Sequence, residues 1–137
     1  MDKKPFRKSV ILGFGGISAV CALMMLSCSP KQPDRYNAQG VVISVEAADQ
    51  GAKRVTILHE AITDFKDPSG KVVGMSPMPM TFMAAPGLST SGINPQSKVR
   101  FTFEVHWDSH ERLILKEIHS IDAATQLDLN GYSVEMV

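Results

Sequence analysis

The chain has 137 residues, of which 44% are hydrophobic, so it can form one small packed domain and is too apolar to be disordered throughout. The 14 basic and 14 acidic residues cancel, so the overall charge gives no reason to expect a nucleic-acid partner. Two cysteines are too few for a disulfide framework or a cysteine-rich zinc site. Eight methionines are the unusual feature of the composition, and their positions decide the functional interpretation.

Residues 1–27 have the layout of a secretory signal peptide, with a basic start and an apolar stretch over residues 10–26. Ser27 before Cys28 resembles a bacterial lipobox, which predicts that Cys28 is acylated and anchors the protein in a membrane. An uncleaved membrane anchor is the alternative, although the apolar run is at the short end of the roughly 20 residues that a spanning helix needs. Either interpretation predicts that the folded part lies in the periplasm or cell envelope.

Cleavage before Cys28 changes the charge and the thiol content of the chain. It would leave 10 basic and 13 acidic residues, a net charge of −3, which argues against nucleic-acid binding. It would also remove Cys21 and leave Cys28 lipidated. Any soft-metal site in the exported domain would therefore have to be built without cysteine.

Residues 28–38 include Pro30 and Pro33 and are typical of a polar tether. From residue 39 to 122 the patterns are those of β-strands. The β-branched run at 41–45 and the alternating run at 53–59 flank a turn at 49–51 and predict a hairpin. A third strand is expected at 78–84, after a loop that includes residues 64–74.

Residues 98–107 alternate most clearly and predict a fourth strand with Trp107 on its core face. Residues 112–121 predict a fifth strand, in which the irregular alternation at Lys116 and Glu117 indicates a bulge. Residues 123–137 form a weakly patterned C-terminal tail. Five short strands without a helix favour an all-β fold, a small antiparallel OB-like barrel, over a sandwich of about seven strands.

Four of the eight methionines fall within residues 75–83. Met78 and Met80 are two apart, so in an extended segment both thioethers leave the same face, with Met75 on the approach to it. Met83 points to the other side and is expected in the core. Thioether sulfur is a soft, neutral ligand that suits Cu(I) and Ag(I) and stays usable in an oxidising compartment.

The methionine run alone does not decide between packing and metal binding, because methionine is also a flexible core filler. Pro77 and Pro79 deny backbone donors to a sheet, which indicates a sheet edge or a barrel mouth near solvent. His59 ends the second predicted strand on its inward face, and imidazole binds Cu(I) well beside sulfur. Taken alone, His59 favours the interpretation as a partly buried histidine hydrogen-bonded to a nearby carboxylate such as that of Glu60.

Three segments in this order resemble the CusF-like periplasmic copper/silver-binding domains. That family combines a second-strand histidine followed by an acidic residue, a later M-x-M-x-F strand and a K-V-x-F-x-F strand. The matching segments here are His59-Glu60, Met78-Pro79-Met80-Thr81-Phe82 and Lys98-Val99-Arg100-Phe101-Thr102-Phe103. The resemblance covers about residues 39–121 and implies a five-stranded OB-like barrel that binds Cu(I) or Ag(I) through His59, Met78 and Met80.

The best-known members of that family carry a tryptophan three residues before the first of the two methionines, where its ring covers the metal. Here this position is Met75. The departure removes the aromatic cover and makes Met75 a candidate for a further sulfur ligand.

Two functions are therefore expected from different classes. The first is a monomeric Cu(I)/Ag(I)-binding protein of the envelope that sequesters the ion or passes it, as a metallochaperone, to a copper/silver efflux or copper-delivery protein. The second is a lipid-anchored OB-barrel adaptor without a metal, which would bind a protein or glycan through exposed loop residues such as Phe65 or Asn94. No acid–base pair or nucleophile arrangement points to catalysis, so an enzyme is not expected.

Overall fold

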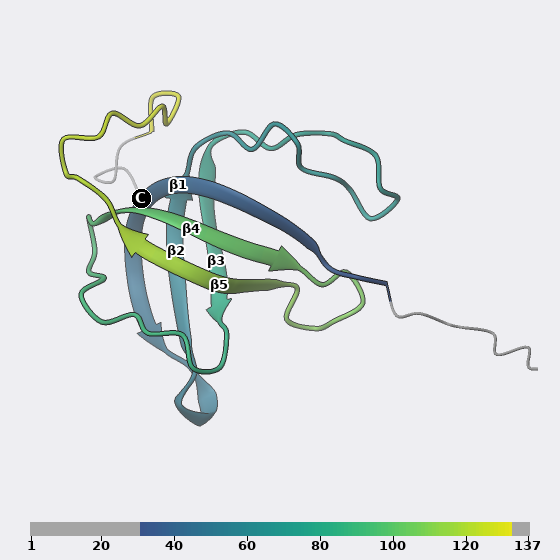
Figure 1. The fold of residues 1–137 in the computed structure, drawn as a ribbon, viewed down its shortest axis with the longest axis horizontal. Coiled ribbons are helices and arrows are strands. Elements are labelled where there is room, and N and C mark those ends of the chain that lie inside the picture. Colours follow the sequence, from purple (N-terminus) through teal and green to yellow (C-terminus); the bar gives the residue numbers. More distant parts are fainter. Residues whose placement is uncertain (1–30, 133–137) are drawn as a thin grey trace, which may run out of the picture. The chain divides into compact units, whose positions relative to one another are not determined.

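A computed structural model describes residues 31–132, so the predicted signal segment, Cys28 and the start of the tether lie outside the described residues. Five strands make up the fold in this part of the chain (Figure 1). They are β1 (Asp34–Ala47), β2 (Lys53–His59), β3 (Met78–Ala84), β4 (Lys98–Val105) and β5 (Leu113–Ser120), with a short 3-10 turn, η1 (Asp49–Gly51), between β1 and β2. Among residues 31–132 no helix is long and apolar enough to cross a membrane.

The strands form a closed barrel in the order β1-β2-β3-β5-β4, which confirms the predicted OB-like barrel. Four of the five contacts are antiparallel, whereas β3 and β5 run parallel, with Met83 opposite Ile114 and Ala84 opposite Leu115. The expectation of a wholly antiparallel sheet was wrong in this respect. Strand directions alternate around the ring, so a ring with an odd number of strands must contain one parallel pair.

The largest difference from the predicted boundaries is at the start of β1. The strand begins at Asp34, and residues 34–38 pair with β4, so the prediction that the tether extends to residue 38 was wrong. Tyr36 points inward and is buried, while its polar neighbours face solvent, and this alternation hides the strand in a polar sequence. The predicted bulge in β5 is confirmed, since Thr102 pairs with Glu117 and Phe103 with Leu115, which leaves Lys116 out of register.

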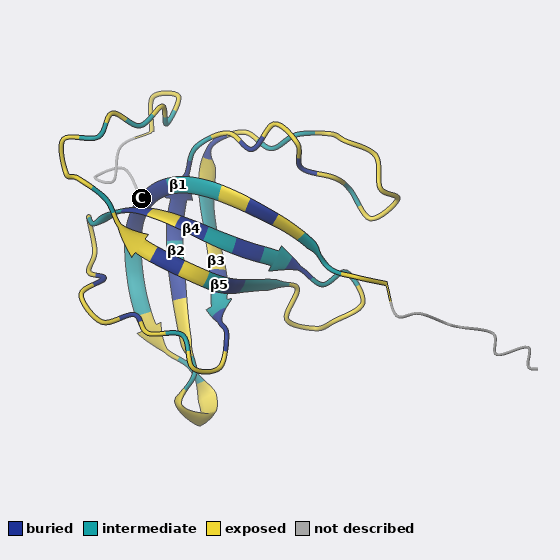
Figure 2. Ribbon diagram, viewed as in Figure 1, coloured by how far each residue is buried: buried dark blue, intermediate teal, exposed yellow. Residues whose placement is uncertain are grey.

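Aromatic rings fill the barrel interior, and Figure 2 shows buried positions along β4 alternating with intermediate or exposed ones. Phe82, Phe101 and Phe103 have ring centroids 4.9 to 5.9 Å apart and are at most 1% exposed. Trp107 packs against this core, as predicted, with its ring 6.2 Å from that of Phe65. Met83 was expected in the core, but it lies between the buried Phe82 and Ala84 on the opposite, outer face of β3.

The connection from β2 to β3 contains its own short ladder and is tied to β1 by the Lys66 N–H, which donates to the Tyr36 hydroxyl at 3.0 Å. Isolated bridges join Ile62 to Met75 and Lys66 to Val72. Phe65 within it is buried, with its ring 5.0 Å from that of Tyr36, so its expected role as an exposed contact residue was wrong. Asn94, in the connection between β3 and β4, is exposed as expected.

Candidate metal centre

The register of β2 and β3 brings three of the predicted ligands together at one end of the barrel. His59 is directly opposite Met78 in this antiparallel ladder, and Met80 is two residues further along β3. Because paired residues and residues two apart share a face, all three side chains leave the same face of the sheet. β2 ends at His59 and β3 begins at Met78, so the donors sit at the barrel mouth.

His59 is fully buried, with 0% of its surface exposed. Its Nδ1 lies 2.6 Å from the backbone carbonyl oxygen of Glu60, which can only accept, so Nδ1–H must be the donor. In the neutral imidazole this leaves Nε2 with a free lone pair, and Nε2 lies 3.1 Å from the Met80 sulfur. Two atoms that can each donate a lone pair to Cu(I) or Ag(I) therefore lie within 3.1 Å of each other, close enough to share one cation.

Burial also sets the charge of His59. Desolvation lowers the pKa of the imidazole below its ordinary value, while the hydrogen bond to the Glu60 carbonyl opposes that shift. The ring is therefore neutral at neutral pH, the protonation state in which Nε2 can act as a ligand. Sequence reasoning had considered the Glu60 carboxylate as the partner, whereas the backbone carbonyl fills this role, and a backbone contact leaves no mark in the sequence.

Met78 and Met80 differ in their exposure to solvent. Met80 is half-buried and packs against the core, whereas Met78 is 41% exposed and is among the few large apolar side chains of residues 31–132 that face solvent. Packing does not account for an exposed methionine at this position, because an exposed thioether gains little from burial. Exposure to solvent thus increases from the buried residue His59 through Met80 to the exposed residue Met78.

Met75 lies at the same end, on the approach to β3. Its backbone exchanges two hydrogen bonds with Ile62, both 2.9 Å, and its half-buried side chain packs against the core. Gly40 of β1 faces His59 across the β1–β2 ladder, and a Cβ there would collide with the Leu58 carbonyl oxygen. Glycine at this position therefore lets β1 approach β2 closely beside the histidine.

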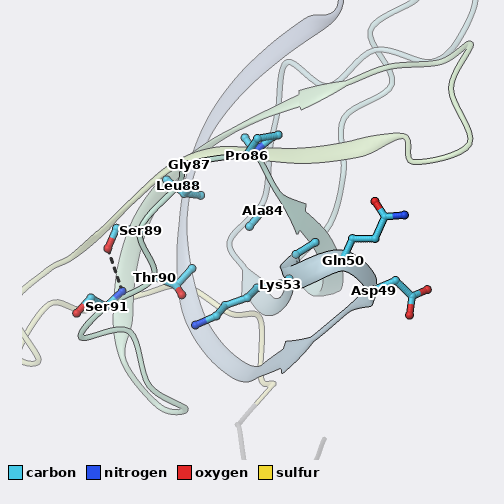
Figure 3. A pocket seen from close by; sticks show the side chains of 13 residues that line it. Asp49, Gln50, Lys53, Ala84, Pro86, Gly87, Leu88, Ser89, Thr90 and Ser91 are labelled. Carbon is cyan, nitrogen blue, oxygen red and sulfur yellow. Dashed lines mark hydrogen bonds between the residues drawn. The ribbon is translucent and has the colours of Figure 1, made fainter.

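The opposite end of the barrel holds a hollow of about 750 Å³ between η1 and the chain that follows β3 (Figure 3). Its lining is mostly small or polar, and Figure 3 shows Lys53 extending toward Thr90 while Asp49 and Gln50 point away. No thioether or imidazole is among its lining residues. In the described part of the chain, no group of three or more His, Cys, Asp or Glu residues could hold a metal ion. His59 with its methionine neighbours is thus the soft-donor arrangement that these residues offer.

Comparison with solved structures returns CusF proteins. Apo-CusF residues 6–88 from Escherichia coli is 26% identical, with a TM-score of 0.45, over 72% of this chain and 100% of that chain. CusF-Ag(I) residues 10–88 from Escherichia coli is also 26% identical, with a TM-score of 0.45, over 66% of this chain and 96% of that chain. Among curated proteins, none matches the chain.

A family model described as "Copper binding periplasmic protein CusF" matches residues 35–114 of the 137-residue chain. This range is more than half of the chain and includes His59, Met75, Met78 and Met80. The chain therefore belongs to the CusF family of copper-binding periplasmic proteins.

Proposed function

We propose that this protein binds Cu(I) or Ag(I) through His59 Nε2 and the thioethers of Met78 and Met80. The observation that carries the proposal is the 3.1 Å distance from His59 Nε2 to the Met80 sulfur, with the exposed residue Met78 directly opposite His59 in the β2–β3 ladder. Membership of the CusF family supports it independently. All three donors are neutral, and the two thioethers are soft while the imidazole is borderline, so the set favours a monovalent soft ion over Zn²⁺, Mg²⁺ or Ca²⁺.

The gradient of exposure supports a role in transfer. Met78 is 41% exposed, so an incoming thioether from a partner protein can displace this ligand first, while the buried His59 and half-buried Met80 still hold the ion. Ligand-by-ligand exchange avoids releasing the ion into water. We therefore propose a metallochaperone or sequestering role, with a copper/silver efflux or copper-delivery protein as the partner and a monomer as the working form.

Met75 is proposed as a further sulfur ligand. It occupies the position where the best-known relatives have the tryptophan that covers the metal, three residues before the first methionine of β3, and its bridge to Ile62 fixes its backbone beside the start of the β2–β3 connection. A Met75→Leu substitution keeps the packing volume and removes the sulfur. If Met75 is a ligand, this variant weakens Cu(I) binding without changing the stability of the metal-free protein.

The site of action is proposed to be the periplasmic face of the envelope. The family is periplasmic, and the sequence of residues 1–28 predicts export and acylation of Cys28. A lipid on Cys28 would leave the barrel attached through the segment before β1. Metabolic labelling with a radioactive fatty acid tests this, because Cys28→Ala should abolish the label.

The ligand assignment is tested with the double variant Met78→Leu plus Met80→Leu. Cu(I) affinity is measured without oxygen, in competition with a chelator of known affinity, and the double variant should no longer compete. Met83→Leu is the matched control, since Met83 is a methionine of the same strand on its outer face. Unchanged affinity in the double variant would overturn the assignment. Absence of Cu(I) and Ag(I) binding by the unsubstituted protein would instead favour the metal-free adaptor.

A further inference from the structure

The C-terminal segment after β5 returns to the end of the barrel that carries His59. The Ile121 N–H donates to the Lys98 carbonyl oxygen at 2.9 Å, and Lys98 Nζ donates to the Thr125 carbonyl oxygen at 2.6 Å. The Asp128 N–H then donates to Glu60 Oε1 at 2.7 Å. We call residues 122–132 the C-terminal strap; it is the yellow segment that leaves β5 in Figure 1.

The strap has internal order, because two short turns stiffen it. Asp122 Oδ1 accepts from the Ala124 N–H at 2.8 Å, and the Asp122 carbonyl oxygen accepts from the Thr125 N–H at 2.9 Å. Further along, Asp128 Oδ1 accepts from the Asn130 N–H at 3.2 Å. These side chains cap their own turns, so the strap presents the Asp128 N–H to the barrel in a defined direction.

Glu60 is the residue that connects the strap to the proposed ligand. Its N–H donates to the Gln39 carbonyl oxygen of β1 at 2.9 Å, and its own carbonyl oxygen accepts from His59 Nδ1–H at 2.6 Å. Its carboxylate accepts from the strap. All three polar groups of Glu60 thus have separate partners, which fixes the carbonyl that orients the His59 ring.

The strap also lies beside the residues that flank the ligands. A hollow of about 420 Å³ is lined by Glu60 and Ala61, by Pro77, and by Asp128 and Asn130 of the strap. Glu60 follows His59 and Pro77 precedes Met78, so the strap borders the site on the side where both ligand strands meet the connecting loop.

We propose that the C-terminal strap and Glu60 are positioning elements of the metal site. The strap holds the Glu60 carboxylate, Glu60 holds His59 Nδ1–H, and His59 Nε2 is thereby kept toward the sulfurs. Partners that orient a ligating histidine through its second nitrogen commonly control metal affinity. This inference rests on the proposed function, since it assigns what tunes the same site.

Two matched pairs of variants test the proposal. Asp128→Pro removes the backbone donor, whereas Asp128→Ala keeps it. Glu60→Ala removes the acceptor, whereas Glu60→Gln retains an oxygen that can accept. We expect Asp128→Pro and Glu60→Ala to weaken Cu(I) binding about tenfold and Glu60→Gln to stay close to the unsubstituted protein. Asp128→Ala should weaken binding less than Asp128→Pro, because both variants lose the carboxylate that caps the turn but only the proline variant also loses the N–H donor.

A metal-free measurement separates this proposal from the proposed function. In the protein without metal, NMR should show that the His59 Nδ1–H exchanges with water faster in Asp128→Pro and Glu60→Ala than in their matched partners. Unchanged exchange together with unchanged Cu(I) affinity would overturn the strap's role. If the unsubstituted protein bound no Cu(I), the proposed function would fail, and the exchange rates alone would show whether the strap orients His59. If Asp128→Pro did not fold, the comparison of Glu60→Ala with Glu60→Gln would test the proposal.

Discussion

The two ends of the β2–β3 ladder belong to the same pair of strands but differ in chemistry. At one end His59 is opposite Met78, and the buried imidazole nitrogen approaches the Met80 sulfur to 3.1 Å. At the other end Lys53 and small polar side chains surround a hollow of about 750 Å³. The barrel provides register and openings at both ends, but among residues 31–132 only the His59 end combines an inward-facing imidazole with inward-facing thioethers, since Met83 at the other end lies on the outer face of β3. The fold thus provides the geometry for both ends, and the proposed function depends on a few donor residues at one of them.

The aromatic core lies between these two ends, so a substitution at one end should not disturb the other. Phe82 of β3 is part of this core: it is fully buried, and its ring lies within 5.3 Å of those of Phe101 and Phe103. Substitutions in the core should therefore change stability, those at the His59 end metal affinity, and those at the Lys53 end neither.

The largest effect is expected from Phe82→Ala. Removing this buried ring loses its transfer free energy and leaves a cavity, so the free energy of unfolding should fall by about 3–5 kcal/mol. Urea denaturation of the metal-free protein measures this. A loss smaller than about 1 kcal/mol would show that the three rings do not form the core that separates the ends.

His59→Leu should have the next largest effect, on affinity. Leucine fills much of the buried space but has no nitrogen, so Cu(I) affinity should fall by more than about 100-fold, a larger loss than is typical for residues that only orient a ligand. Chelator competition measures it, with Met83→Leu as the control on the outer face. Affinity that survives this change would mean that the sulfurs hold the ion without the imidazole.

A smaller effect concerns the pH dependence of stability without metal. Burial lowers the pKa of folded His59 below the ordinary 6.5, so at a pH just below 6.5 the unfolded chain binds a proton that the folded barrel does not. The neutral, buried His59 ring therefore contributes fully to the free energy of unfolding above pH 6.5, and this contribution is lost as the pH falls below 6.5 and the unfolded chain takes up the proton. Urea denaturation across this range should show a shallower dependence for His59→Leu. Equal slopes would contradict the assigned burial of the neutral ring.

The smallest effect is expected at the opposite end. Lys53→Ala changes the charge of the hollow, but it leaves the donor atoms and the core intact, so Cu(I) affinity should not change measurably. A clear loss of affinity in chelator competition would show that the two ends of the ladder are coupled and do not act separately.

Much of the fold could be predicted from local patterns, because strands with one buried face alternate. β3 has the predicted bounds of residues 78–84, and the bulge at Lys116 was visible as a break in alternation. The start of β1 was missed because Asp34, Arg35 and Asn37 alternate with one buried tyrosine and resemble a linker. Phe65 was misplaced because its burial depends on Tyr36, a residue that is distant in sequence.

The proposed site likewise contains residues that could be predicted from the sequence and contacts that could not. His59, Met78 and Met80 could be proposed from residue type, spacing and resemblance, since their donor atoms are in their side chains. The Glu60 carbonyl and the Asp128 N–H could not, because backbone groups are the same in every residue and act here only through the tertiary fold. The same reason hid the C-terminal strap, whose sequence is weakly patterned but whose amide reaches the residue after the histidine.

The most direct test of the central claim is X-ray absorption at the copper edge of the protein loaded anaerobically with one equivalent of Cu(I). Our account predicts sulfur scattering together with the multiple scattering of one imidazole, with two sulfurs from Met78 and Met80 and a third if Met75 also binds. A spectrum with only nitrogen and oxygen neighbours would contradict it, and would return the methionines of β3 to a packing role.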